Sequence, residues 1–260
     1  MHLNRQLRND LDKERNFFKR TLGSANIHFM QLRGSMMLME SKIQIKILLI
    51  DSKESYEQYS YLEQFVSKER RKKIFKLKKE TKKILSLFAE LLLRTDLLQR
   101  KLEEQELIVR RGACGKPMIE GKGVYHFSIS HSENAVVFVS GNQELGIDCE
   151  KVRTIETSSF GRWLSKEEQK VLNESKDSLD AFFRIWTAKE AFVKMTGEGI
   201  TEYFNKINIC NIGIKGYLKT VRYKDYRITV CSKLCKKKEI EVREISKVDI
   251  LNVWNDKGYD

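Results

Sequence analysis

The sequence predicts an α+β fold built from two related halves. Short segments alternate apolar and polar residues, as strands do, and longer segments repeat apolar residues at helical spacing. A pattern of strand, helices and strands occurs twice, around residues 42–139 and 145–231. The chain has 260 residues, which suits one large domain or two small ones.

The first half opens with a strand and continues with a very basic segment. KIQIKILLI (42–50) alternates and then closes into a short apolar run, which predicts a strand. Between Lys68 and Lys83 there are ten basic and two acidic residues, and from Ile84 apolar residues recur at helical spacing. We expect a basic helix start that leads into an amphipathic helix, for which a solvated lysine face is the simplest interpretation.

Three strands are expected next. The chain's one proline lies in GKP (115–117) and marks a turn before them. VYHFSISHS (124–132) and NAVVFVSG (134–141) predict a hairpin with its turn at HSEN, and QELGIDCE (143–150) leads into a third strand.

The second half contains the clearest helix of the chain. LSKEEQKVL carries a capping box, Ser165 with Glu168, which we assign to helix initiation. LDAFFRIWTAKEAFVKMTG is strongly helical and ends at Gly197, a residue that favours a helix C-terminus. Segment 205–233 then predicts strands, and KKKEIEVREI (236–245) an edge element.

These elements suggest three regions. Residues 1–38 form a charged leader with several methionines near its end, which we expect to be dispensable or not made in the cell. Residues 39–142 form the N-terminal half and residues 143–260 the C-terminal half.

Composition narrows the possible partners and location. Lys and Arg number 49 against 36 Asp and Glu, a net charge of +13, so the protein attracts nucleic acid, anionic membranes, phosphorylated ligands or acidic proteins. Neither a membrane span nor a signal peptide is recognisable, and five irregularly spaced cysteines indicate reduced thiols that pack in the interior. We therefore expect a cytoplasmic protein with no membrane partner.

Three carboxylates form the main candidate site. In GIDCE (146–150), Asp148 and Glu150 lie on one face of the expected strand, and like charges side by side require a cation between them. Glu190 lies on the helix that must pack against this sheet. Three hard oxygen ligands suit Mg²⁺, or equally Mn²⁺. Alone, Glu190 with Lys194 four residues later is simply a helix surface pair.

Four motifs in order carry a resemblance. GIDCE with WTAKEAFVK, preceded by GKP and FSISHS, resembles the 4′-phosphopantetheinyl transferases of the larger, surfactin-synthetase-activating type, over about residues 42–232. The resemblance implies two pseudo-symmetric α+β halves with the active site in the cleft between them. It also implies a monomeric enzyme that moves phosphopantetheine from coenzyme A to a serine of an apo acyl- or peptidyl-carrier protein. Such carriers serve fatty acid, polyketide or nonribosomal peptide biosynthesis, and the other product is adenosine 3′,5′-bisphosphate.

The resemblance also assigns roles to residues. It implies that Asp148, Glu150 and Glu190 hold the Mg²⁺ and that Glu190 takes the proton of the carrier serine. Lys194 is expected at the reacting phosphate, with Lys189 beside it. The implied coenzyme A contacts are Arg70, Lys73, Ser86, Lys116, Pro117, Ser130 and His131.

Two alternatives belong to other classes. A Mg²⁺-dependent nuclease also needs carboxylates and lysine, although its lysine commonly lies two residues beyond the second acid on a strand. A non-catalytic nucleic-acid-binding protein could use segment 68–83, but this leaves both carboxylate motifs unexplained and no nucleic-acid partner is expected.

Overall fold

A computed structural model describes residues 42–102, 108–112, 115–120, 125–201, 204–210, 217–233 and 239–255. Residues 43–260 form one compact unit. The predictions for the leader, residues 1–38, lie outside the described residues, as do Cys114 and Cys235.

In the described part of the first half there are a 3₁₀ helix of ten residues, two α-helices and five strands. They are β1 (Lys42–Leu49), η1 (Tyr56–Phe65), α3 (Lys68–Phe75), α4 (Glu80–Gln99), β2 (Ile108–Arg111), β3 (Pro117–Glu120), β4 (His126–Ser132) and β5 (Ala135–Gly141). β4 and β5 form the predicted hairpin, in which Ser132 pairs with Ala135.

The second half contains one long helix among shorter elements. They are β6 (Leu145–Lys151), η3 (Thr157–Trp163), α5 (Lys166–Glu174), α6 (Ser178–Thr196), η4 (Phe204–Lys206), β7 (Tyr217–Tyr223), β8 (Tyr226–Ser232), β9 (Glu239–Glu244) and α7 (Lys247–Asn255). The capping box of Ser165 and Glu168 is confirmed, and Gly197 ends α6 in the left-handed conformation at φ 79°.

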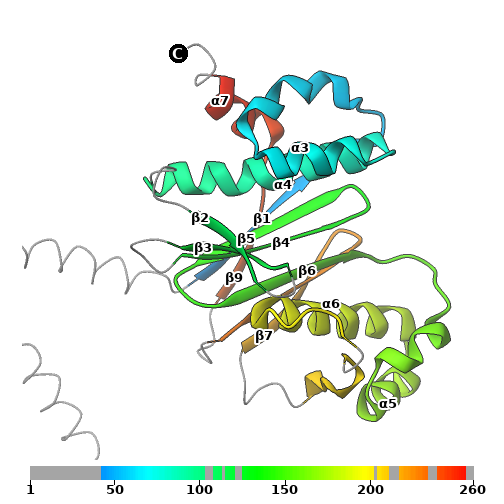
Figure 1. The fold of residues 1–260 in the computed structure, drawn as a ribbon. Helices are drawn as coiled ribbons and strands as arrows, with labels where there is room; N and C mark the ends of the chain where they lie inside the picture. Colours follow the sequence, from blue (N-terminus) through cyan, green and yellow to red (C-terminus); the bar gives the residue numbers. More distant parts are fainter. Residues whose placement is uncertain are drawn as a thin grey trace, which may run out of the picture. The chain divides into compact units, whose positions relative to one another are not determined.

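Two sheets and two long helices stack in four layers, as Figure 1 shows. One sheet has the strand order β4-β5-β1-β9, and α4 covers its outer face. The other has the order β6-β8-β7 and is covered by α6. Between the sheets lies a buried core of aliphatic side chains, among them Ile45, Val137 and Ile228. The prediction of an α+β fold with two halves is therefore confirmed.

The last strand and helix return to the first sheet. β9 lies beside β1 at the sheet edge, as the prediction of an edge element requires. α7 packs near α4, where the indole nitrogen of Trp254 donates to the hydroxyl of Thr95 at 3.0 Å. Residues 239–255 thus complete the first layer pair, although they lie within residues 143–260, the predicted C-terminal half.

The basic segment forms two helices, where the sequence predicts one basic helix start that continues into the next helix. α3 ends at Phe75 and α4 begins at Glu80, so lysine-rich residues 76–79 connect them. Closely spaced like charges disfavour a continuous helix. The break also lets α3 pack on α4, where Arg70 meets Glu90 at 3.1 Å.

Among the described residues, no helix has both the length and the apolar character that a membrane span requires.

Candidate active site

Strands β4 and β6 lie side by side where the two halves meet. Alternate serines of β4 contact β6: Ser128 Oγ accepts from the Ile147 amide at 3.0 Å, and Ser130 Oγ donates to Asp148 Oδ1 at 2.7 Å. Ser132 Oγ in turn donates to Glu150 Oε2 at 2.7 Å. The predicted alternation is confirmed, since Asp148 and Glu150 share one face while Cys149 is buried in the core.

A glycine allows α6 to approach this strand closely. A Cβ atom at Gly146 would overlap the backbone of Ala191 and of Met195. Only glycine fits such an approach, which explains why GIDCE begins with this residue. The same approach brings Glu190 and Lys194, on α6, to the carboxylates of β6.

Lys194 lies among the carboxylates. Its ammonium nitrogen is 2.6 Å from Asp148 Oδ1, 2.9 Å from Ser130 Oγ and 3.8 Å from Glu190 Oε2. Although burial opposes its charged form, the negative charges of Asp148 and Glu190 raise the pKa of Lys194. The structure thus brings together the predicted Asp148, Glu190 and Lys194, and places the predicted Ser130 with them.

Two of the carboxyl groups hold protons more tightly than usual. Burial and the neighbouring charge of Asp148 raise the pKa of Glu190 to about 7, despite the opposing effect of Lys194. Burial also raises the pKa of Glu150, whose partners are Ser132 and, at 3.3 Å, the guanidinium of Arg153. One ammonium group therefore compensates the charges of this cluster only in part.

The same cluster fits a hard divalent cation. Oδ2 of Asp148 is buried and has no hydrogen-bond partner. In the part of the chain that the structure describes, no three His, Cys, Asp or Glu side chains already surround a common metal position. Lys194 Nζ lies 2.6 Å from Asp148 and 3.8 Å from Glu190 and supplies positive charge to these carboxylates. A bound cation would give the unpaired carboxylate oxygen a partner. Its positive charge would also lower the two raised carboxyl pKa values.

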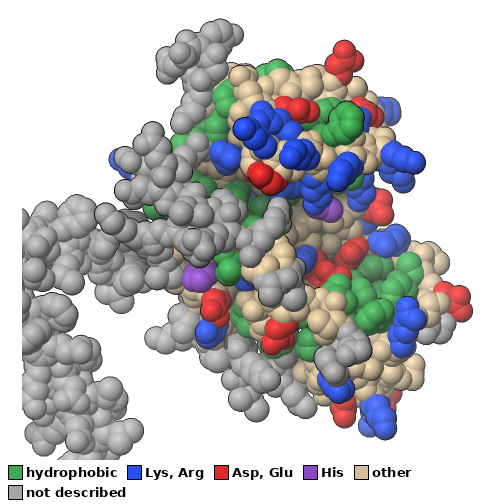
Figure 2. Space-filling model, in the orientation of Figure 1, with side chains coloured by type: hydrophobic (Ala, Val, Ile, Leu, Met, Phe, Trp, Pro, Cys, Tyr) green, Lys and Arg blue, Asp and Glu red, His purple; other side chains and the backbone are tan. Residues whose placement is uncertain are grey.

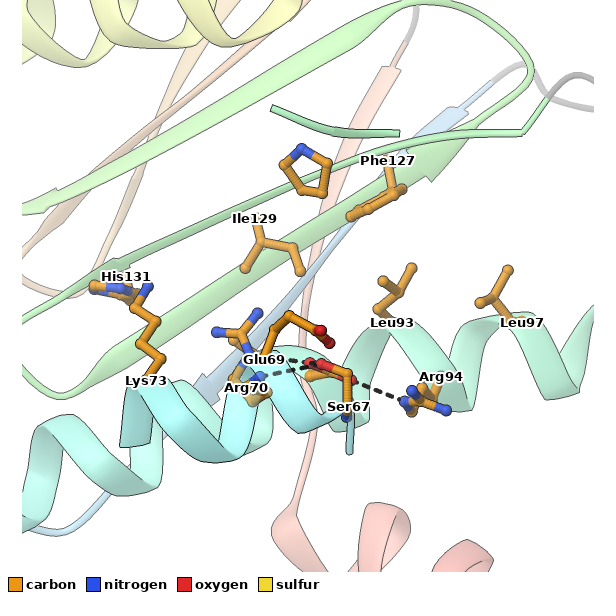
Figure 3. Close-up of a pocket in the computed structure, with 13 residues that line it drawn as sticks. Ser67, Glu69, Arg70, Lys73, Leu93, Arg94, Leu97, Phe127, Ile129 and His131 are labelled. Carbon is orange, nitrogen blue, oxygen red and sulfur yellow. Dashed lines mark hydrogen bonds and ion pairs between the residues drawn. The ribbon is translucent and has the colours of Figure 1, made fainter. Parts of the chain in front are cut away.

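A cavity of about 440 Å³ lies between α3 and α4 on one side and β4 on the other (Figure 3). Leu93 and Leu97 of α4 and Phe127 and Ile129 of β4 supply its apolar walls. Its polar lining comes from Ser67, Glu69, Arg70, Lys73, Glu90, Arg94 and His131.

Most predicted coenzyme A contacts meet in this cavity. Arg70, Lys73, Pro117 and His131 all line it. Figure 2 shows Lys and Arg side chains gathered over α3 and α4, above acidic side chains in the middle of the molecule. Partial desolvation and the positive charges of nearby lysines lower the pKa of His131 to about 4, so His131 is neutral near pH 7; these lysines are Lys82, Lys73 and Lys194. His131 of the cavity wall directly follows Ser130 in β4, and Ser130 bonds both Asp148 and Lys194, so the cavity and the carboxylate cluster meet at this strand.

Ser86 and Lys116 do not line this cavity. Ser86 is buried beneath the cavity wall, where its hydroxyl accepts from Arg70 Nη1 at 3.3 Å. The ammonium of Lys116 donates to the carbonyl oxygen of Met195 at 2.8 Å, so it binds the C-terminal end of α6. Lys116 lines a separate cavity of about 430 Å³ with Pro117 and Gly197. Its position is explained by its opposite charge to the carbonyl end of a helix.

Lys189 does not lie beside Lys194, contrary to the sequence-based prediction. Its ammonium forms a fully buried ion pair with Glu168 at 2.8 Å and also donates to the Ile207 carbonyl. Residues five apart on an α-helix point in directions about 140° apart, so Lys189 and Lys194 face different ways. Lys189 therefore joins α6 to α5 within the second half.

Sequence reasoning missed Glu90 and Arg94. Glu90 is buried, and its carboxylate forms ion pairs with the Nε atoms of Arg70 and Arg94, each at 3.1 Å. The available signal was an acid–base pair at (i, i+4) on an otherwise apolar helix face, where a charged pair requires a reason.

Comparison with known proteins identifies the class. A sequence profile of the 4′-phosphopantetheinyl transferase superfamily matches residues 144–241. The 4′-phosphopantetheinyl transferase psf-1 of Bacillus pumilus is 31% identical over 160 residues, which cover 60% of this chain and 69% of that protein. The 4′-phosphopantetheinyl transferase Sfp of Bacillus subtilis (strain 168) is 30% identical over 157 residues, or 59% of this chain and 70% of Sfp.

A longer alignment links the chain to the 4′-phosphopantetheinyl transferase gsp of Aneurinibacillus migulanus, with 24% identity over 220 residues, 77% of this chain and 90% of gsp. These relatives are transferases by name and give no support to the nuclease or nucleic-acid-binding alternatives. Two halves with carboxylates and a lysine beside a basic cavity are compatible with this class of enzyme. The chain belongs to the 4′-phosphopantetheinyl transferase superfamily.

Proposed function

We propose that this enzyme transfers the 4′-phosphopantetheine group of coenzyme A to a serine of an apo acyl- or peptidyl-carrier protein. Adenosine 3′,5′-bisphosphate is the other product. The observation that carries this proposal is the position of the Asp148–Lys194–Glu190 cluster beside the basic cavity of α3 and α4. Membership of the family supplies the reaction that joins these two parts.

The cavity is proposed to hold the adenosine and 3′-phosphate end of coenzyme A. Arg70 and Lys73 supply positive charge, and Phe127 and Ile129 supply apolar surface for a base. His131, which lines the cavity and follows Ser130 in β4, donates or accepts a hydrogen bond in its neutral form. This orientation directs the pyrophosphate of coenzyme A toward Lys194.

Glu190 is proposed as the general base. In the metal-free site the pKa of Glu190 is about 7, and a bound cation would lower it, so that Glu190 is in the ionised form that accepts a proton. The serine oxygen of the carrier forms a bond to the phosphorus that bears pantetheine, and its proton passes to Glu190. The bond from this phosphorus to the bridging pyrophosphate oxygen breaks, and the electron pair leaves with adenosine 3′,5′-bisphosphate.

Lys194 stabilises the charge that develops on the phosphate oxygens. Its ammonium lies next to Glu190 and Ser130, so it is near the proposed base and would reach the phosphate that is attacked. Such stabilisation is the main source of rate in phosphoryl transfer. Lys189, buried with Glu168, supports α6 and contacts no substrate.

Asp148, Glu150 and Glu190 are proposed to hold Mg²⁺, for which Mn²⁺ is a chemical alternative. When bound, the metal would neutralise negative charge on the pyrophosphate. Asp148 is the central ligand in this proposal, because its Oδ2 atom is buried without a partner.

The net charge of +13 fits both substrates, because coenzyme A is an anion and an acidic carrier surface would be steered toward the protein. Both halves lie in one chain, so a monomer is sufficient for activity. A cytoplasmic location follows from the proposed substrates.

Intact-mass spectrometry of an apo carrier protein tests the reaction. The carrier is incubated with the enzyme, coenzyme A and Mg²⁺, with and without a chelator. We expect a mass gain of one phosphopantetheine that is absent with chelator. If neither acyl-carrier nor peptidyl-carrier proteins gain this mass, the proposal is contradicted.

A further inference from the structure

Glu90 is the centre of a hydrogen-bonded network in the wall of the basic cavity. One carboxylate oxygen accepts from the Ser67 amide at 2.6 Å and from Arg94 Nε at 3.1 Å. The other accepts from Ser67 Oγ at 3.0 Å and from Arg70 Nε at 3.1 Å. Four donors thus converge on a side chain of α4 that is only 8% exposed.

These contacts keep Glu90 ionised. Although burial favours the neutral acid, the Ser67 amide and the guanidinium of Arg70 lower the pKa of Glu90 below its ordinary value. A buried negative charge next to a cavity for anions opposes anion binding by its charge alone. Its benefit must therefore come from the groups that it orients.

All three of those partners line the cavity, and Ser67 also fixes the helix that carries Arg70. Arg70 and Arg94 come from different helices, and both are held through Nε. Ser67 caps α3 by accepting from the Arg70 amide, so Glu90 also fixes the start of α3. Arginine side chains lose considerable conformational entropy when they bind a ligand, and orientation in advance reduces that loss.

We infer that Glu90 is a positioning residue that orients Arg70 and Arg94 to bind the 3′-phosphate of coenzyme A, and that Arg94 is a further phosphate-binding residue. This inference rests on the proposed function, because it assumes which end of coenzyme A enters the cavity. Glu90 itself does not touch the substrate.

Calorimetric titration with coenzyme A and with 3′-dephospho-coenzyme A tests this role. Wild type should prefer coenzyme A, and Glu90→Gln should reduce this preference about ten-fold because a charge-assisted contact to each arginine is lost. Affinity for 3′-dephospho-coenzyme A should change less than about two-fold. A merely structural role would weaken both ligands alike, which would overturn the inference.

Glu69→Gln is the matched control. Glu69 lines the same cavity, so this variant removes the same charge without the network around Ser67. It should bind coenzyme A at least as tightly as wild type. Equal losses in Glu69→Gln and Glu90→Gln would also contradict a positioning role.

Two further measurements separate the possible failures. Should Glu90→Gln not fold, Arg94→Gln must show the same loss of preference, and an unchanged preference overturns the inference. Should wild type bind neither form of coenzyme A, the proposed function fails. The network is then tested with inorganic pyrophosphate, and equal affinities of wild type and Glu90→Gln refute the role of Glu90.

Discussion

The ammonium nitrogen of Lys194 lies 2.6 Å from Oδ1 of Asp148, within the group of carboxylates proposed to bind Mg²⁺. Lys194 therefore neutralises charge that a metal would also neutralise. It also has a proposed role at the phosphate, and one ammonium group cannot serve both positions fully at once. Metal binding and release of Lys194 toward the substrate should be linked.

Lys194→Met should bind Mg²⁺ more tightly than wild type in the absence of substrate. Removal of a positive charge this close to the ligands favours a divalent cation by about ten-fold or more. The same variant should lose most of its turnover, because no cation remains for the phosphate. Mg²⁺ titration by calorimetry and transfer assays measure the two effects. Weaker Mg²⁺ binding by Lys194→Met would mean that Lys194 orders the ligands and does not compete with the metal.

Glu190→Gln should stabilise the metal-free protein at high pH. Because the pKa of Glu190 rises from 4.5 to about 7 on folding, the folded state binds this proton more tightly than the unfolded state. Stability is therefore lost as the pH rises from about 4.5 to about 7 and is constant above it. The variant should gain up to about 3 kcal/mol at pH 8, and nothing at pH 4.

Urea unfolding in the presence of EDTA measures this gain. Glu174→Gln is the control, since Glu174 is exposed on α5 and its 3.8 Å pair with Lys170 contributes little. Mg²⁺ should stabilise wild type and not Glu190→Gln. If Glu190→Gln is less stable than wild type at pH 8, burial and the charge of Asp148 do not destabilise the ionised form of Glu190.

Gly146→Ala should destabilise the protein and disrupt the site together. The added Cβ would overlap the backbone of Ala191 and Met195, so α6 must move away from β6. Overpacking of this kind costs about 1–3 kcal/mol. Because Lys194 and Glu190 move with α6, turnover should fall by at least about ten-fold even where the protein is folded.

Thermal unfolding and transfer assays at a temperature where both proteins are folded measure these effects. Gly161→Ala is the control, because a Cβ there meets no atom within 4 Å. Its stability should change by less than about 0.5 kcal/mol. Normal turnover in Gly146→Ala would show that the close approach of α6 is not required.

The sequence was sufficient where local periodicity determines the structure. Alternation along β6 predicted that Asp148 and Glu150 share a face, and the structure confirms it because a strand places every second side chain on one side. The sequence was insufficient at the break between Phe75 and Glu80. This break depends on repulsion between the lysines and on how α3 packs on α4, and helical periodicity alone encodes neither.

Long-range partners were the other limit. Nothing in the neighbourhood of Lys189 indicates that its ammonium meets Glu168, which lies 21 residues earlier and also closes a capping box. For the same reason, the sequence indicates the pair of Glu90 and Arg94 but not the contacts of Glu90 with Ser67 and Arg70, which reach it only after the chain reverses between two helices. The motif predicted that Lys189 and Lys194 lie on one helix, but it did not predict that their side chains point in directions about 140° apart.

Lys189→Met should destabilise the fold without a direct effect on chemistry. The pair of Lys189 and Glu168 is fully buried, and loss of one partner leaves an uncompensated charge, which costs about 3–5 kcal/mol. Glu168→Gln should cost a similar amount, because it also weakens the bond from the amide of Ser165. The double variant Lys189→Met/Glu168→Gln should cost less than the sum of the two, since neither charge remains unpaired.

Denaturant unfolding of all three variants measures this coupling, and Lys170→Met, which breaks an exposed pair on α5, is the control. At temperatures where the variants are folded, Lys189→Met should keep the wild-type affinity for coenzyme A and a turnover within about three-fold, because its side chain contacts α5 and the Ile207 carbonyl and not the cavity. A stable Lys189→Met with abolished transfer would return Lys189 to the reacting phosphate, as its motif alone predicted. Destabilisation with retained turnover would instead establish it as the internal support of the helix that carries Glu190 and Lys194.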